Sequence, residues 1–346
     1  MRDEYISKIS ASGKVVLRSS LKENFLESIN GLILDCDGVL INNFDLYHEA
    51  VKQTVKVILS PFFKEILIPK SSYYMLKSKG TFNNDWDISF CFISSLIAGN
   101  DEIITNLTLI DEQLSPKDKL NSIRRFDLAK NANYGSLNLL VKKISSPSVD
   151  DIARVLSVDV SLIRKLSRIL LLPKVVGEGL IPTILEEIYH GSLIKEIYGV
   201  EGILGIKRGL IEKEKLEIKE EEMSYLFSKF NGKIGILSGR PRKSAEYALS
   251  RILPFISKSF FMEEGGDKKP DPSLLEKIMK NLGMNFALVV GDSAEDIFLV
   301  ENARRIGLRC LSCGITGGHK WKLKLFKSLK ADIICNSFRS LIEMLR

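Results

Sequence analysis

Residues 32–41 read Leu-Ile-Leu-Asp-Cys-Asp-Gly-Val-Leu-Ile, so two carboxylates follow a short apolar run. Such a run is typical of a strand that is buried on both faces of a sheet. Side chains two residues apart in a strand lie on the same face, and Asp35 and Asp37 can therefore converge on one small site. Two carboxylates this close repel each other unless a cation or a proton lies between them. Aspartate and glycine are also common in plain turns, so the pair needs partners elsewhere in the chain to indicate a site.

The composition is that of a globular protein. The chain has 346 residues, of which 45% are hydrophobic and 27% charged, which suits one large domain or two modest ones. No stretch approaches the ~20 apolar residues of a membrane span, and the N-terminus lacks a signal-peptide pattern. The odd number of cysteines, five, favours reduced core residues, and we expect a cytoplasmic protein. The net charge of +7 favours anionic ligands, from phosphorylated metabolites to nucleic acid, without choosing between them.

Short apolar runs alternate with helix-like segments in the second half of the chain. The runs that predict strands after the first one are 234–237, 260–262, 287–290, 308–311 and 333–335. The segments that predict helices between and after them are 242–253, 272–282, 295–306 and 319–329. Strands that alternate with helices predict an α/β fold with a doubly wound parallel sheet.

The first strand is separated from the second by about two hundred residues. Helical apolar spacing occurs there at 50–59, 89–97 and 184–197, and the charged stretch 207–222 suits a solvated helix or a connector. We therefore expect a discontinuous core of residues 1–45 plus 228–346, with a large helical insertion at 46–227. Ligands bind at the carboxyl ends of the strands in such sheets, where the insertion leaves the core.

Polar residues follow three of the later strands. Ser238 and Gly239 end the second strand, Lys269 precedes a helix that starts with proline, and Asp292 and Asp296 follow the strand at 287–290. Each group also fits a plainer structure: a turn, a surface corner or a helix cap. Together with Asp35 and Asp37 they form a set, because the carboxyl ends of parallel strands meet at one edge of the sheet.

This set of side chains suits phosphoryl transfer. A carboxylate can attack phosphorus and form an aspartyl-phosphate, while a hydroxyl, an amide N–H and an ammonium neutralise the phosphoryl oxygens. Mg²⁺ binds one or two carboxylates and keeps waters, and it would relieve the repulsion among Asp35, Asp37 and Asp292. Asp37 can protonate the leaving group and then deprotonate water.

These motifs resemble those of the haloacid dehalogenase superfamily, subfamily I, whose members include phosphoglycolate phosphatases. The resemblance covers roughly 28–45 and 228–346 and implies that the insertion is an enlarged helical cap. It implies that Asp35 is the nucleophile and that Asp37 is the general acid and base, which also binds Mg²⁺ through its carbonyl.

The resemblance also assigns roles to the later motifs. Ser238 and the Gly239 amide would bind the phosphoryl group, and Asp292 would bind the metal with support from Asp296. Lys269 would pair with Asp35 and phosphate. Lys268 stands where many members have glycine, which leaves open which lysine points inward; Lys269, next to proline, is favoured.

The presence of Asp37 favours phosphate-ester hydrolysis over dehalogenation, because an alkoxide leaving group needs an acid and a halide does not. We therefore expect a Mg²⁺-dependent phosphatase that acts on a small phosphorylated metabolite. A phosphomutase-type phosphotransferase is the alternative within the same chemistry.

The insertion carries two further candidate elements. Residues 80–87 resemble a cap signature of the phosphoglycolate-phosphatase-like group, and Asn84, Asp85 and Trp86 are candidate substrate-binding residues. The alternative is a loop that caps the following helix and buries the indole. Residues 148–170 resemble a helix-turn-helix, so a regulatory or nucleic-acid-binding protein is the second alternative; a pair of amphipathic helices has the same pattern. The oligomeric state is left open.

Overall fold

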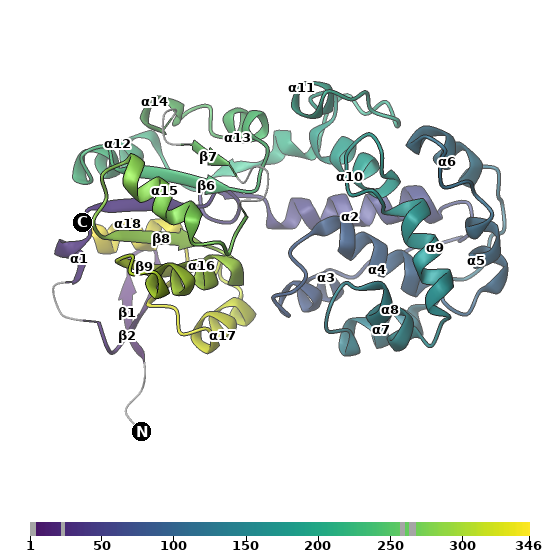
Figure 1. Cartoon of the computed structure of the whole chain (residues 1–346), viewed down its shortest axis with the longest axis horizontal. Coiled ribbons are helices and arrows are strands. Elements are labelled where there is room, and N and C mark those ends of the chain that lie inside the picture. Colours follow the sequence, from purple (N-terminus) through teal and green to yellow (C-terminus); the bar gives the residue numbers. More distant parts are fainter. Residues whose placement is uncertain (1–4, 22–24, 257–259, 263–267) are drawn as a thin grey trace. The chain divides into compact units, whose positions relative to one another are not determined.

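The computed structural model describes residues 5–21, 25–256, 260–262 and 268–346. The chain divides into two compact units (Figure 1). The core unit consists of Met1–Phe44 and Glu214–Arg346, and the helical unit consists of Asp45–Lys213.

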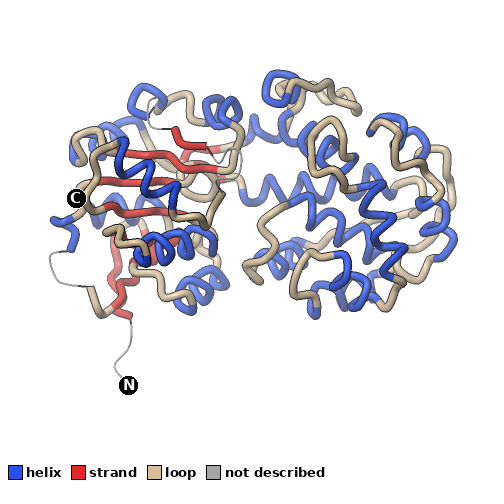
Figure 2. Tube along the Cα trace, in the orientation of Figure 1, coloured by secondary structure: helices blue, strands red, loops and turns tan. Residues whose placement is uncertain are grey.

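A mainly parallel sheet lies at the centre of the core unit (red in Figure 2). Its described strands are β1 (Tyr5–Ser10), β2 (Gly13–Arg18), β3 (Gly31–Leu34), β6 (Ile234–Ser238), β7 (Phe260–Met262), β8 (Ala287–Gly291), β9 (Cys310–Ile315) and β10 (Ile333–Cys335). They lie in the order β1-β2-β10-β9-β8-β3-β6-β7, and all pairs from β10 to β7 are parallel. The predicted α/β fold with a doubly wound parallel sheet is confirmed.

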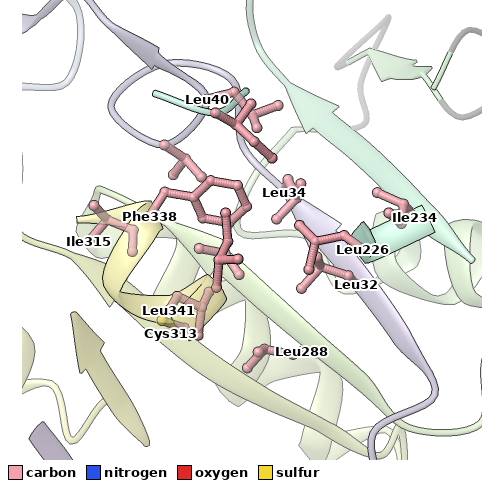
Figure 3. Close-up of a cluster of buried hydrophobic side chains, with 14 of the residues drawn as sticks. Leu32, Leu34, Leu40, Leu226, Ile234, Leu288, Cys313, Ile315, Phe338 and Leu341 are labelled. Carbon is pink, nitrogen blue, oxygen red and sulfur yellow. The ribbon is translucent and has the colours of Figure 1, made fainter. Parts of the chain in front are cut away.

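Helices cover both faces of this sheet. The helices on one face are α12 (Glu220–Lys229), α13 (Arg242–Ala248), α14 (Leu253–Ile256) and α18 (Phe338–Leu345), and those on the other are α15 (Ser273–Asn281), α16 (Ala294–Arg305) and α17 (Lys320–Ser328). Leu32 and Leu34 pack toward Phe338 of α18 (Figure 3), whereas Ile33 packs toward α15 and α16. Because side chains alternate along a strand, a run of apolar residues is buried on both sides.

An N-terminal hairpin extends the sheet and was not predicted from the sequence. Strands β1 and β2 pair antiparallel, and β2 pairs antiparallel with β10, near the other end of the chain. The turn between them ends at Gly13, which has a φ of +140°. A Cβ at this position would lie 2.9 Å from Ser340 Oγ, so glycine suits both the backbone and the space. The α1 helix (Phe25–Ser28) then leads to β3.

Three predicted elements differ in the structure. The strand predicted at 308–311 occupies Cys310–Ile315, because Gly307 and Leu308 belong to the turn after α16. The helix predicted at 184–197 is divided into α10 (Leu180–His190) and α11 (Ile194–Tyr198) at Gly191, whose φ of +60° ends the first helix. The charged stretch 207–222 forms short elements: the 3₁₀ helix η1 (Leu210–Lys213), β5 (Lys215–Leu216) and the start of α12.

The core unit resumes at Glu214, earlier than the expected boundary at 228. Strand β5 pairs with β4 (Ile41–Asn42), which lies in the first core segment. Met223 and Leu226 of α12 are buried in the cluster beneath the sheet (Figure 3). Residues 214–227 therefore pack with the sheet, and burial of their apolar side chains holds them there.

The helical unit is built from short helices. They are α2 (Phe44–Leu59), which starts at the last residue of the core segment, α3 (Lys70–Lys77), α4 (Asp85–Ile97), α5 (Asp101–Thr108), α6 (Pro116–Ile123), α7 (Tyr134–Lys143), α8 (Val149–Leu156), α9 (Val160–Leu170), α10, α11 and η1. Residues 87–97 of α4 are all buried, so this helix is central to the unit. Within the described residues, no helix is both long and apolar enough to cross a membrane. All five cysteines are buried and free, as expected.

Candidate active site

The carboxyl ends of three neighbouring strands bring the predicted polar residues together. Asp35 follows β3, Ser238 ends β6 and Asp292 follows β8. Strand β3 lies between β6 and β8, and the Asp35 N–H donates to the Val290 carbonyl at 2.9 Å. This edge of the sheet is where open α/β sheets bind ligands.

A tight turn after β3 presents Asp35 and Asp37. The Cys36 carbonyl accepts hydrogen bonds from the N–H groups of Leu40 and Ile41, at 2.9 and 3.0 Å. The Gly38 N–H donates to the Ile41 carbonyl at 2.8 Å. Asp35 Oδ1 accepts from the Cys36 N–H at 2.7 Å, which holds the carboxylate against its own backbone.

The ammonium of Lys269 lies between two carboxylates. Lys269 Nζ is 2.9 Å from Asp35 Oδ2 and 2.8 Å from Asp296 Oδ1. All three side chains are largely buried, so these charge-assisted bonds are little screened by water. Lys268 is exposed. Of the two adjacent lysines, the fold turns Lys269 toward Asp35.

Asp35, Asp292 and Asp296 form a carboxylate cluster that could hold a metal ion. One oxygen of each lies within 4.8 Å of the others. Asp296 Oδ1 is paired with Lys269, and its Oδ2 accepts from the N–H and hydroxyl of Ser293 at 3.0 and 2.7 Å. Both oxygens of Asp296 are thus engaged, and its predicted supporting role beside Asp35 and Asp292 stays a prediction. Carboxylate oxygens of this kind fit a hard cation such as Mg²⁺.

Electrostatics distinguish the members of this cluster. Burial raises the pKa of Asp35 well above its ordinary value; Lys269 opposes this, and the nearby Asp296 and Asp292 carboxylates add to it. Burial disfavours the charged forms of Lys269 and Asp296, but their mutual attraction outweighs it, so the Lys269 pKa is raised and the Asp296 pKa lowered. The surroundings thus favour the charged forms of Lys269 and Asp296 and disfavour the charged form of Asp35, which a bound cation would favour.

Asp37 is held by two residues that sequence analysis did not assign. Asp37 Oδ1 accepts from Arg240 Nη1 at 3.0 Å and from Asn43 Nδ2 at 2.5 Å. Arg240 Nη2 lies 2.9 Å from each carboxylate oxygen of Glu214. Arg240 directly follows the predicted Ser238 and Gly239, but its partner Glu214 lies in the charged stretch interpreted as a connector. No local pattern joins them.

Ser238 is the last residue of β6, and Gly239 begins the turn after it. Ser238 is buried, and its Oγ accepts from the Arg240 N–H at 3.2 Å. Gly239 is exposed. The Ser238 hydroxyl and Gly239 thus lie at the carboxyl end of β6, the strand that pairs with β3.

A second buried ammonium, also not predicted, lies beside Asp292. Lys322 Nζ is 2.5 Å from Asp292 Oδ2 and 4.8 Å from the centre of the Phe44 ring. Its side chain is 5% exposed. Lys322 comes from α17, which has three other lysines, so the sequence gave no sign of which lysine points into the core.

The candidate substrate residues of the helical unit all have partners within that unit. Asn84 caps α4 by accepting from the Trp86 N–H at 2.8 Å. Asp85 pairs with Lys77 at 3.1 Å and accepts from Tyr73 Oη at 2.9 Å. The Trp86 indole N–H donates to Glu186 at 2.9 Å. These contacts stabilise the unit, and a role in substrate recognition stays a prediction.

The segment 148–170 forms two helices joined by a short turn. Helices α8 and α9 meet at Ser157, which has a left-handed φ of 55°. Two cationic side chains of α9 face acids: Arg164 lies 3.5 Å from Asp150, and Arg168 lies 3.4 Å from Glu112. The segment is therefore a helix pair with mixed charge at its surface, and nucleic-acid binding stays a prediction.

Comparisons with known proteins agree with this fold. Residues 194–303, from α11 to α16, match the family described as haloacid dehalogenase-like hydrolase. This segment of the chain, about a third of its length, is similar to haloacid dehalogenase-like hydrolases.

Two solved structures are similar to this chain in fold. A target of the Northeast Structural Genomics Consortium has a TM-score of 0.59 and 17% identity, over 92% of this chain and 98% of that one. The phosphatase Tt82 from Thermococcus thioreducens has a TM-score of 0.55 and 20% identity, over 86% of this chain and 98% of that one. No curated protein sequence matches the chain.

The matched residues include Ser238, Lys269 and Asp292. The strand that leads to Asp35 lies outside the matched residues. It pairs with β6 and β8, which both lie within the matched residues.

Proposed function

We propose that the chain is a Mg²⁺-dependent phosphatase that hydrolyses a small phosphorylated metabolite through an aspartyl-phosphate on Asp35. The observation that carries this proposal is the position of Asp35 at the strand edge, 2.9 Å from the buried Lys269 ammonium and next to two further carboxylates. The hydrolase family match supports it, as does the similarity in fold to a phosphatase.

In the first step, an oxygen of the Asp35 carboxylate attacks phosphorus. The bond between phosphorus and the ester oxygen breaks, and the departing oxygen takes a proton from the Asp37 carboxyl group. The Lys269 ammonium keeps Asp35 in place and attracts the phosphoryl oxygens.

In the second step, Asp37 takes a proton from water as the water oxygen attacks phosphorus. The bond between phosphorus and the Asp35 oxygen breaks, which releases inorganic phosphate and restores the carboxylate. One side chain thus serves as acid and then as base.

The carboxylates of Asp35 and Asp292, together with the Asp37 carbonyl, would hold Mg²⁺. When bound, the ion supplies positive charge that favours ionised Asp35 and neutralises phosphoryl oxygens. Asp296 supports the set by fixing Lys269 and Ser293. The Ser238 hydroxyl and the Gly239 N–H would bind the remaining phosphoryl oxygens.

The helical unit would act as the cap that selects the metabolite. Its Asn84, Asp85 and Trp86 combine an amide, an acid and an indole, which suits a polar small molecule.

The direct test is release of phosphate from p-nitrophenyl phosphate with and without Mg²⁺. Replacement of Asp35 by Asn keeps the size of the side chain and removes the nucleophile, so Mg²⁺-dependent release should be lost. Asp127→Asn is the matched control, because Asp127 is exposed in the helical unit. Equal activity of the Asp35→Asn variant and the wild type would contradict the proposal.

A panel of phosphorylated metabolites then separates hydrolysis from transfer. A phosphatase releases phosphate into water, whereas a phosphomutase returns it to the product. Retention of phosphate in an isomeric product would favour the phosphomutase-type alternative.

A further inference from the structure

Arg240 is a buried guanidinium whose side-chain nitrogens each meet a different partner. Nη1 lies 3.0 Å from Asp37 Oδ1, Nη2 lies 2.9 Å from both oxygens of Glu214, and Nε donates to Ser244 Oγ at 2.9 Å. The side chain is 2% exposed. The guanidinium group is planar, and contacts at all three of its nitrogens fix its orientation. The contacts of Nη2 and Nε therefore determine where Nη1 lies.

Glu214 is the residue that holds the Arg240 guanidinium group in this orientation. Its side chain is 4% exposed and faces Nη2 with both oxygens. Glu214 also lies 3.4 Å from Asn43 Nδ2, and Asn43 is the second donor to Asp37. The arginine, the amide and the two carboxylates therefore form one connected hydrogen-bonded cluster. In such a cluster the removal of one charge leaves a buried counter-charge unpaired.

This cluster contains the points where the chain leaves and re-enters the core unit. The first core segment ends at Phe44, directly after Asn43, and the second begins at Glu214. The adjoining strands β4 and β5 pair with each other, and Asn42 Nδ2 donates to Glu217 at 2.9 Å. Asp37 is thus tied through hydrogen bonds to both peptide connections between the units.

We propose that Arg240 is a positioning residue, held by Glu214, that orients Asp37 for proton transfer to the leaving group. This inference rests on the phosphatase function proposed above. Arg240 and Asn43 both donate to Oδ1 and hold the carboxyl group, whose proton passes to the leaving oxygen as the bond from phosphorus to that oxygen breaks. Without Arg240 the carboxyl group rotates out of line. Protonation of a basic leaving group then becomes slow, whereas attack by Asp35 is unaffected.

The test compares two substrates that share the phosphoryl group and differ in the leaving group. An alkyl phosphate needs the proton from Asp37, whereas 2,4-dinitrophenyl phosphate leaves with little help. The quantity to compare is kcat/KM, because it reports the steps up to formation of the phosphoenzyme. For Arg240→Met, kcat/KM should fall about 100-fold on the alkyl phosphate and by less than about threefold on the dinitrophenyl ester.

A second readout follows from the later role of Asp37 as base. In the Arg240→Met variant, hydrolysis of the phosphoenzyme becomes the slow step on the dinitrophenyl ester. Rapid mixing should therefore show a burst of dinitrophenolate, equal to about one product per enzyme, before a slow steady state. If Arg240 only supported the fold, its replacement would lower the burst amplitude and the steady-state rate together.

Two further variants complete the test. Glu214→Gln should show the same dependence on leaving group with a smaller loss, and it decides the question if Arg240→Met does not fold. Arg242→Met is the matched control, because Arg242 is exposed and pairs with Glu246 on the surface. Equal losses on both substrates, or none, would overturn the positioning role while the phosphatase function stands. Wild-type protein inactive on both esters would instead remove the phosphatase function and this inference with it.

Discussion

Gly38 lies so close to Asp292 that a Cβ atom on it would be 2.1 Å from Asp292 Oδ2. Its φ of +70° is also one that glycine adopts most readily. The glycine of the Asp-x-Asp-Gly motif therefore allows the turn after β3 to lie against the carboxylate that follows β8. The two halves of the proposed metal site depend on this contact.

Replacement of Gly38 by Ala should displace Asp292. We expect phosphatase activity to fall by more than about 100-fold, since a shift of about 1 Å at a reacting centre has that effect. Binding of Mg²⁺, measured by calorimetry, should weaken as well. Gly307→Ala is the control, because Gly307 has a φ of +90° with nothing within 4 Å of its Cβ position. Both variants should lose about 1 kcal/mol of stability or more, and only the first should lose metal binding.

Adjacent lysines give a second prediction. Lys269 is buried against Asp35 and Asp296, whereas Lys268 is exposed. Lys269→Met should lower kcat about 100-fold or more, because it removes the cation beside the nucleophile. Lys268→Met should change kcat by no more than about twofold. Comparable losses in the two variants, in p-nitrophenyl phosphate assays of folded protein, would contradict the assignment of Lys269.

Lys322 gives a prediction about metal affinity. Its ammonium lies 2.5 Å from Asp292 Oδ2, the carboxylate proposed to bind Mg²⁺, and it is buried. Without this charge, Asp292 repels the neighbouring carboxylates more strongly, so the metal-free protein should become less stable. A divalent cation relieves that repulsion.

Lys322→Met should therefore have a lower Tm than the wild type without Mg²⁺ and a larger rise in Tm when Mg²⁺ is added. The rise follows the ratio of metal concentration to Kd, so it measures affinity independently of catalysis. Lys324→Met, an exposed neighbour on the same helix, is the control. A smaller rise in the Lys322→Met variant would show that the ammonium helps to hold Asp292 for the metal.

The polar residues at the strand ends were predictable from sequence for a physical reason. A strand buried on both faces has a continuous apolar run, and the polar residue that ends it marks the edge of the sheet. Asp35, Ser238 and Asp292 each have this context, and parallel pairing of β3 with β6 and β8 brings them together. The common edge follows from the topology alone.

Arg240 and Lys322 were not predictable in the same way. Their partners, Glu214 and Asp292, lie 26 and 30 residues away in the chain, in segments with no shared pattern. The N-terminal hairpin was missed for a related reason, since β2 is stabilised by pairing with β10 near the opposite terminus. Contacts between distant segments depend on the tertiary fold, and periodicity does not report them.

Glu186 gives a prediction about the stability of the helical unit and its dependence on pH. The buried carboxylate accepts from the Trp86 indole and Tyr198 Oη, each at 2.9 Å, and lies 3.1 Å from His190 Nδ1. Burial disfavours the carboxylate, but His190 and the two other donors outweigh it and hold the pKa of Glu186 below its ordinary value. The unfolded chain therefore binds this proton more readily than the folded one.

The sign of the pH dependence follows from that difference. The carboxylate stabilises the fold fully above the unfolded pKa of about 4.3, and the stabilisation is lost as the pH falls through the lower folded pKa. Glu186→Gln should lower the free energy of unfolding by about 2 kcal/mol at pH 7, since buried donors lose an acceptor. In urea titrations this difference from the wild type should shrink below about pH 4. Glu178→Gln, at an exposed position of the same unit, should leave stability unchanged. If the difference in the free energy of unfolding between this variant and the wild type stayed constant between pH 7 and pH 3.5, the stabilisation would come from side-chain packing rather than from the charge of Glu186.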